Sequence, residues 1–164
     1  MDADRKAQSR WLSREEQRVW RAYLEANRLL ADELERDMQR DAGMPHTYYE
    51  VLVRLSEAEG RALRMSELAD RSRSSRSRLS HAVGRLEEAG WVRRQACPTD
   101  ARGTVAVLTD EGFAALEAAA PGHVEAVRRH LFDRLTPAQV RQLGDISRAV
   151  RDHLLSVPQH GPGG

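Results

Sequence analysis

A stripe of apolar residues in the middle of the chain constrains the fold more than any other feature. It consists of Leu79, Ala82, Val83, Leu86 and Ala89. Their intervals of three and four residues are typical of one buried helix face, and Gly90 follows where a helix-ending glycine is common. The stretch just before, SRSSRSRLS (72–80), would alone resemble a disordered Arg/Ser tract. The stripe predicts instead a turn followed by a helix whose first turn is polar and exposed.

Helix signals also dominate both ends of the chain. Ser13 and Glu16 form a capping box before a helix that we expect to run to DAGMP (41–45), where Gly43 and Pro45 end it. A second helix is expected over about 46–58, followed by a turn at EAEGRAL (57–63). A short helix over 65–71 is expected to be capped by Ser66, and Ser75 to cap the helix that carries the stripe.

The second half of the chain predicts two strands and two more helices. WVRRQA (91–96) and TVAVL (104–108) read as short strands, joined by a projecting loop, CPTDARG. Thr109 is expected to cap a helix that reaches about Leu135, with a bend at Pro121. Thr136 and Gln139 form a second capping box, with proline at the first helical position, before a last helix.

Composition sets the class of protein. The 164 residues are 40% hydrophobic and 31% charged, which suits a folded domain over about 12–157, with a flexible N-terminus at 1–11 and a disordered tail at 158–164. No apolar run is long enough to span a membrane, and no leader pattern is evident at the N-terminus. With a single cysteine, Cys97, we expect a cytoplasmic protein. No metal, cofactor or catalytic motif appears, so an enzyme is not expected.

Charge is concentrated in one segment although the net charge is only +1. Residues 64–103 have nine basic and five acidic side chains, whereas residues 1–63 have 11 and 13. A local basic patch is typical of phosphate contacts. The order helix, turn, helix, strand, loop, strand is that of a helix-turn-helix with a wing, which places one helix in the DNA major groove.

Serine and arginine at the start of that helix suit this role, because arginine forms bidentate bonds with guanine or phosphate and serine adds little bulk. Arg94 is expected to contact phosphate. Arg102, at the loop tip, is expected to enter the minor groove. The predicted DNA-binding residues are Ser74, Ser75, Arg76, Ser77, Arg78, His81, Arg94, Asp100 and Arg102.

Several motifs then resemble one family. Asp100-x-Arg102 followed by Leu108-Thr109-x-x-Gly112, with LAD (68–70) and RLEEAGWVRR (85–94), is similar to the winged-helix core of MarR-type transcriptional regulators. The resemblance extends over roughly 12–155. It implies a mainly α fold with a small β wing, in which a winged helix-turn-helix lobe (61–109) is flanked by dimerisation helices (12–60 and 110–157).

The resemblance also implies a function. A homodimer would bind a pseudo-palindromic operator in double-stranded DNA, most simply as a repressor, with Asp100 steadying Arg102. A small aromatic or phenolic ligand could release it from a cleft near Trp20, Tyr23, His46, Tyr48 and Tyr49; a plain core with a polar rim is the alternative for these residues. Gly103 departs from the family, which often has a second arginine there. Gly84, inside the recognition helix, either lets DNA approach closely or is tolerated by good packing.

Two other functions stay open. Cys97, near Arg93, Arg94 and Arg102, could make the protein a redox-responsive regulator. An architectural DNA-binding protein is also possible, although the net charge of +1 argues against it because nonspecific binders need many phosphate contacts.

Overall fold

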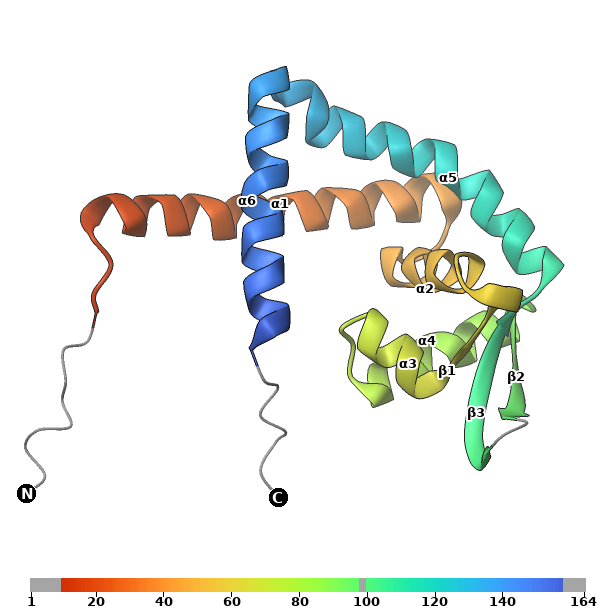
Figure 1. The fold of residues 1–164 in the computed structure, drawn as a ribbon. Coiled ribbons are helices and arrows are strands. Elements are labelled where there is room, and N and C mark those ends of the chain that lie inside the picture. The colour runs from red at the N-terminus through yellow and green to blue at the C-terminus, as the bar shows by residue number, and fades with distance from the viewer. Residues whose placement is uncertain (1–9, 98–99, 158–164) are drawn as a thin grey trace, which may run out of the picture.

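A computed structural model describes residues 10–97 and 100–157 (Figure 1). Helix α1 (Arg14–Ala42) begins at the predicted capping box, in which Ser13 accepts from the amide of Glu16 and Glu16 accepts from the amide of Ser13. It ends at Gly43, whose φ of 65° is left-handed. Helix α2 (His46–Ser56) follows, and the Glu35 carboxylate of α1 accepts from the amide of His46 at 3.0 Å, which caps the new helix.

A winged helix-turn-helix lobe comes next. A 3₁₀ turn, η1 (Glu59–Arg61), leads to strand β1 (Ala62–Arg64), helix α3 (Met65–Arg71), helix α4 (Arg76–Glu88) and strands β2 (Val92–Cys97) and β3 (Asp100–Leu108). The three strands form an antiparallel sheet in the order β1-β3-β2. A register shift between Ala96 and Cys97 ends the regular pairing of the wing.

Two helices complete the chain. Helix α5 (Asp110–His130) begins at Thr109, whose hydroxyl accepts from the amide of Gly112 and donates to the carbonyl of Gly90. The short η2 (Phe132–Arg134) then leads to α6 (Pro137–Ser156), which starts at the predicted Thr136/Gln139 capping box. In Figure 1, α5 lies along the C-terminal half of α1, while α6 crosses in front of α1.

The sequence predictions differ from the structure in five details. Strand β1 was missed because its three residues are too short to show alternation, and it lies in the segment predicted as a turn. Ser66 does not cap α3; it lies inside the helix, which begins at Met65 after extended Arg64. Helix α2 ends at Ser56, and α5 ends at His130 rather than near Leu135. Strand β3 begins at Asp100, so it includes four residues of the predicted loop.

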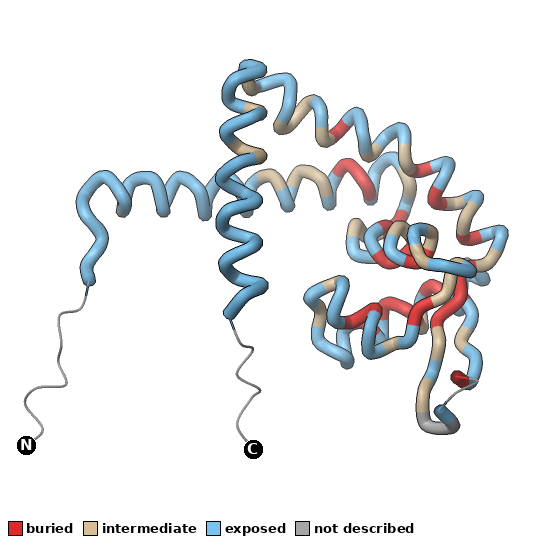
Figure 2. Tube along the Cα trace, in the orientation of Figure 1, coloured by how far each residue is buried: buried red, intermediate tan, exposed pale blue. Residues whose placement is uncertain are grey.

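The core lies in the lobe and in the segments of α1, α2 and α5 that pack against it. Figure 2 shows buried segments in α2, α3, α4, the sheet and the adjoining part of α5, whereas the N-terminal half of α1 and all of α6 are mostly exposed. The largest fully buried side chains are Leu52, Leu55, Leu68, Leu79, Leu86, Val51, Val83 and Val92. Four residues of the predicted stripe, Leu79, Ala82, Val83 and Leu86, are buried and pack toward α2 and α3, so α4 presents its opposite face to solvent. The fifth, Ala89, was wrongly predicted to be buried: it follows the last residue of α4 and is exposed.

A buried carboxylate joins α1 to α5. Asp37 is only 5% exposed, and its oxygens lie 2.6 Å from Arg129 Nη2, 2.8 Å from His130 Nε2 and 2.7 Å from Arg40 Nη1. The hydrogen bond with His130, helped by Arg40 and Arg129, lowers the Asp37 pKa to about 2 against the opposing effect of burial. This cluster fixes where α5 crosses α1, and therefore how the lobe is oriented relative to the two long helices.

Candidate nucleic-acid interface

The first turn of α4 presents a polar face. The Ser75 hydroxyl accepts from the amide of Arg78 at 3.3 Å, which confirms it as the helix cap. Arg76, Ser77, Arg78 and His81 are all exposed, while Leu79, Ala82 and Val83 beside them in sequence are buried. Helical periodicity alone therefore turns every predicted contact of this helix outward.

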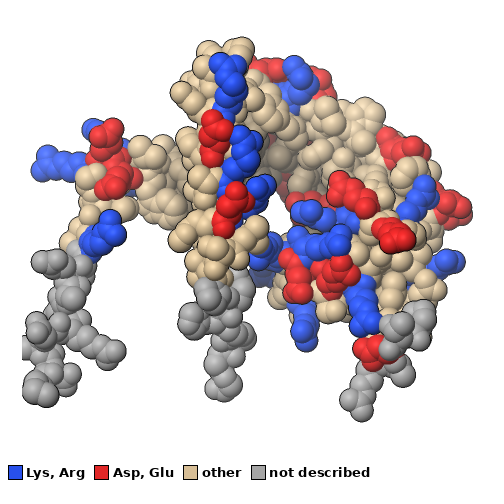
Figure 3. Space-filling model, viewed as in Figure 1, with Lys and Arg blue, Asp and Glu red and all other residues tan. Residues whose placement is uncertain are grey.

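The turn before α4 is tightly built. Arg73 has a φ of 49°, a left-handed value unusual for a residue with a side chain. The amide of Ser74 donates to the carbonyl of Ala69 at 3.1 Å, which closes the turn and leaves Ser74 half-buried. Ser74 is thus the least accessible of the predicted serines. In Figure 3, arginine side chains gather over the part of the lobe that holds α3 and α4, mixed with acidic ones.

A groove of about 490 Å³ separates α4 from the wing. It is lined by Arg64, Met65, Ser66, Arg76, Ser80, Arg94, Asp100, Gly103 and Thr104. Arg64 was missed in the sequence; its guanidinium lies 3.7 Å from Asp100 Oδ2. The side chain of Arg102 lies outside the described part of the chain. The structure therefore brings Asp100, Arg76 and Arg94 to one groove, together with an arginine from β1.

The absence of a side chain at Gly103 has a steric reason. A Cβ placed there would lie 3.0 Å from Cys97 Cβ and 3.2 Å from Asp100 Oδ2, closer than ordinary contacts. The wing therefore closes tightly at the position where the family resemblance led us to expect a second arginine. Cys97 itself is only 7% exposed, so an oxidant has little access to its sulfur in this conformation.

Arg94 is held by the protein itself. Its Nη2 donates to the carbonyl of Ser80 at 2.6 Å, and its amide donates to Glu87 Oε1 at 2.9 Å. Its Nη1 lies 3.7 Å from Glu87 Oε2. The side chain is 31% exposed, whereas the neighbouring Arg93 is an exposed residue.

The aromatic residues predicted to line a ligand cleft fall into separate groups. Trp20 and Tyr23 stack on each other, 6.1 Å between centroids, on the exposed half of α1. His46 and Tyr49 lie elsewhere, against His123 of α5, with ring centroids 5.1 and 4.6 Å from that residue. Tyr48 lies between the hollow beside Ser77 and Arg78 and another at the end of α4. The protomer alone does not bring all five together.

His123 is a member of this group that the sequence analysis missed. It lines a hollow of about 220 Å³ with His46, Tyr49, Glu50, Val53, Arg54 and Glu57. His46 Nε2 and His123 Nδ1 are buried and make no hydrogen bond within the described residues. Burial, and secondarily the charge of His46, lowers the His123 pKa, while burial raises that of Tyr49.

The start of α5 is locked to the lobe through a glycine. A Cβ on Gly112 would overlap the carbonyl oxygen of Trp91 and lie 2.8 Å from Leu108 Cδ1. The amide of Thr109 also donates to that carbonyl at 3.0 Å. The pattern Leu-Thr-x-x-Gly thus describes one joint, at which the last strand leads into α5 against Trp91, three residues after the end of α4.

Known proteins share this arrangement. A family model described as MarR family matches residues 42–103. Sco3205, a MarR family transcriptional regulator from Streptomyces coelicolor solved in complex with DNA, is 57% identical with a TM-score of 0.86, and the match covers 94% of this chain and 97% of that one. This chain belongs to the MarR family. AbsC, a MarR family regulator from the same organism, is 45% identical over 91% of this chain and all of its own, with a TM-score of 0.83.

Curated MarR-like relatives are more distant. The HTH-type transcriptional regulator PecS of Dickeya dadantii is 30% identical over 95 residues, which are 58% of this chain and 57% of PecS. The repressor YetL of Bacillus subtilis is 31% identical over 107 residues, or 63% of this chain and 64% of YetL. The matches thus span less than two thirds of these relatives. Separately, none of the helices within residues 10–97 and 100–157 is long and apolar enough to cross a membrane.

Proposed function

We propose that this MarR family member is a transcriptional regulator that binds a specific double-stranded DNA sequence in the cytoplasm. The exposed face of α4 beside the basic groove is the observation that supports this most directly. Arg76, Arg78 and His81 face solvent on the helix that the family places in the major groove, and Sco3205 was solved with DNA. An arginine on a guanine edge and a serine on a phosphate are contacts that this face can make.

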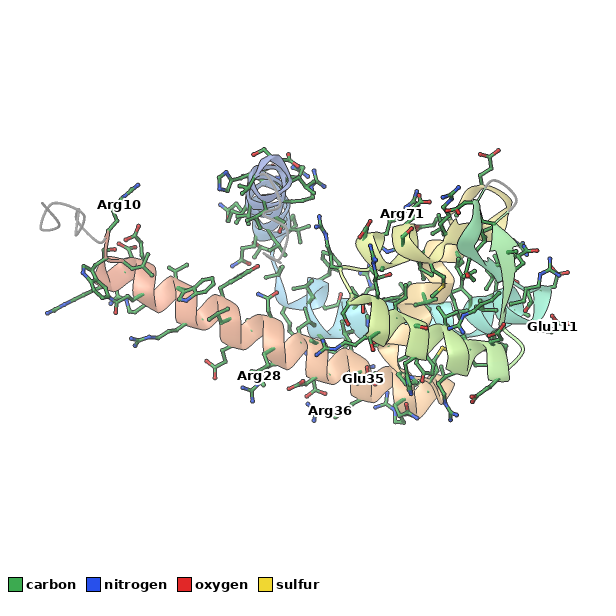
Figure 4. The ribbon with its side chains drawn as sticks, turned by 90° about the horizontal axis from the view of Figure 1, so that it is seen from below. Arg10, Arg28, Glu35, Arg36, Arg71 and Glu111 are labelled. Carbon is green, nitrogen blue, oxygen red and sulfur yellow. The ribbon has the colours of Figure 1, made fainter. Side chains whose placement is uncertain are left out.

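We also propose a homodimer. Large apolar side chains that are exposed in the protomer lie mostly on three stretches: the first half of α1 with the residues just before it, the end of α5 with η2, and α6. They include Trp11 at 87%, Val19 at 64%, Val124 at 55%, Ile146 at 62% and Leu154 at 58% exposure. Figure 4, seen from below, shows α6 end-on and apart from α1, while Arg28 and Arg36 of α1 point away from it.

A second copy is the simplest cover for these faces. Helix α6 buries no residue, yet its apolar positions recur at helical spacing, which a helix stable by itself does not require. Interlocked terminal helices would bury well over about 2,000 Å², as obligate dimers do. Such a dimer presents two copies of α4, which suits a two-fold symmetric operator.

Selection of bound sequences from a random DNA library tests the proposal. We expect a pseudo-palindromic site and a log–log slope of affinity against salt of about −7, because roughly eight phosphates would be neutralised by the dimer. Competition with excess random DNA separates a specific regulator from an architectural protein. A slope shallower than about −3, or equal affinity for all sequences, contradicts the proposal.

We propose repression as the mode of regulation and a small aromatic acid as the effector. YetL, which is 31% identical to this chain over 107 residues, is named as a repressor. The two unpartnered ring nitrogens of His46 and His123 offer hydrogen bonds to a carboxylate or phenol, although a hollow of about 220 Å³ admits little more than one ring. Titrating salicylate against the protein–operator complex tests this. Release of the operator from the wild type but not from His123→Ala supports the proposal, and no release from the wild type contradicts it.

A further inference from the structure

Gly84 lies on the side of the recognition helix that faces the wing. Ser80, Gly84 and Glu87 are spaced at i, i+4 and i+7, so they share one stripe of α4. The nearest atom to a Cβ built on Gly84 is Arg94 Nη2, at 3.8 Å. That distance is an ordinary van der Waals contact, so the arginine of β2 lies over Gly84 on the side of α4 that faces the wing.

Strand alternation explains how Arg94 reaches this stripe. Val92 is 2% exposed and packs in the core, and Arg94, two residues on, shares its face of β2. Arg93 points to the other face. The guanidinium then donates to the carbonyl of Ser80 at 2.6 Å, the amide of Arg94 donates to Glu87 Oε1 at 2.9 Å, and Arg94 Nη1 forms an ion pair with Glu87 Oε2 at 3.7 Å. A carbonyl has two lone pairs, so Ser80 can serve the helix and Arg94 together.

We propose that Arg94 is a positioning residue that fixes the recognition helix relative to the wing, and that it does not neutralise a DNA phosphate. This inference rests on the proposed DNA-binding function. It replaces the sequence expectation that Arg94 contacts phosphate, because the guanidinium is tied to α4 by a charge-assisted hydrogen bond to the Ser80 carbonyl and by an ion pair with Glu87. We call this arrangement the α4–β2 bracket; it consists of Ser80, Glu87 and Arg94, with Gly84 beneath them.

Glu87→Ala gives the sharpest test. Removing an acidic side chain near DNA ordinarily strengthens binding, because it reduces repulsion of phosphate. If the bracket sets the helix angle, Glu87→Ala instead weakens specific binding by about tenfold, as the loss of one charged hydrogen bond does. A phosphate-binding Arg94 freed from Glu87 would bind DNA more tightly, so an affinity gain in Glu87→Ala overturns the proposal.

The variants Arg94→Ala and Arg94→Lys give a second, independent test. We expect both to lose about tenfold in operator affinity while the salt slope stays that of the wild type, since an ammonium cannot span Ser80 and Glu87 together. Two results together would identify a phosphate contact and refute the bracket: Arg94→Lys keeps the wild-type affinity for the operator, and the salt slope of Arg94→Ala becomes shallower by about 2 per dimer. Arg93→Ala is the matched control, because it removes the same charge from the opposite face of β2.

Hydrogen exchange in the DNA-free protein separates the bracket from the proposed function. Loss of either partner should speed exchange of amides in β2 and β3 by about tenfold, and the double variant should add little to either single change. Unchanged exchange in both variants refutes the bracket even if DNA binds. Faster exchange without any operator binding by the wild type keeps the bracket and refutes the DNA-binding proposal.

Discussion

Replacing Asp37 with asparagine should destabilise the protein by an amount that depends on pH. The carboxylate is buried and pairs with Arg40, Arg129 and His130, and these partners lower its pKa to about 2 from the ordinary aspartate value of 3.8. A group whose folded pKa is depressed stabilises the fold above its unfolded pKa and loses that contribution as pH falls through the folded one. The difference corresponds to about 2 kcal/mol near neutrality, about half of which is lost by roughly pH 3.

Urea unfolding followed by circular dichroism at a series of pH values measures this. Wild type and Asp37→Asn should differ by about 2 kcal/mol between roughly pH 5 and 8, and the two should converge as pH falls from about 4 toward 2. Protein concentration must be the same throughout, because the stability of a dimer depends on it. Equal slopes of free energy against urea in both proteins show that the change lies in stability alone.

Asp41→Asn is the matched control. Asp41 also pairs with Arg40, at 2.7 Å, but its side chain is 43% exposed. An exposed pair contributes little, so this variant should lose less than about 1 kcal/mol. The reasoning is refuted if Asp37→Asn and Asp41→Asn cost the same, or if the Asp37→Asn difference does not change between pH 6 and 3.

Three further changes test other parts of the structure. Gly112→Ala should lower the free energy of unfolding by about 1–3 kcal/mol, because the added Cβ overlaps the Trp91 carbonyl. Gly144→Ala is the control: its Cβ meets only the flexible Arg148 side chain, so it should raise the free energy of unfolding by up to about 1 kcal/mol. Thermal unfolding compares the two variants. Arg78→Ala should weaken binding by about 1–3 kcal/mol on the selected operator and by less on random DNA. The loss of binding in Arg102→Ala should shrink when A·T flanks of the operator are replaced by G·C. Gel shifts on matched operators measure both, and an equal loss on all DNA would make Arg78 a phosphate contact. Ile146→Asp should convert the dimer to monomer in sedimentation at micromolar concentration, whereas Gln142→Asp, an exposed substitution on the same helix, should not; a wild-type monomer contradicts the dimer itself.

Local chemistry made most of the fold predictable. Capping residues such as Ser13, Ser75, Thr109 and Thr136 act on amides within three residues, so their role is written in the adjacent sequence. The stripe of α4 was likewise readable, since it depends only on helical period. The alternation of Arg94 with Val92 places Arg94 on the inner face of β2, whereas its positive charge alone predicts a phosphate contact.

Contacts between distant segments were not predictable in the same way. Asp37 stands among charged residues that read as a solvated helix face, and its partners Arg129 and His130 come 92 and 93 positions later. His46 meets His123 only because α5 folds back across α2. Nothing in either local pattern distinguishes these histidines from surface ones.

The exposed apolar faces of α1 and α6 have a consequence for the life of the protein in the cell. On the dimer proposal, a newly made subunit is an incomplete object whose terminal helices are open to proteases and to unrelated apolar surfaces until it meets a copy. The lifetime of the regulator would therefore rise with its own abundance. A subunit defective in α4 but intact in α1 and α6 would also capture sound partners, so a single mutant allele would be expected to act dominantly.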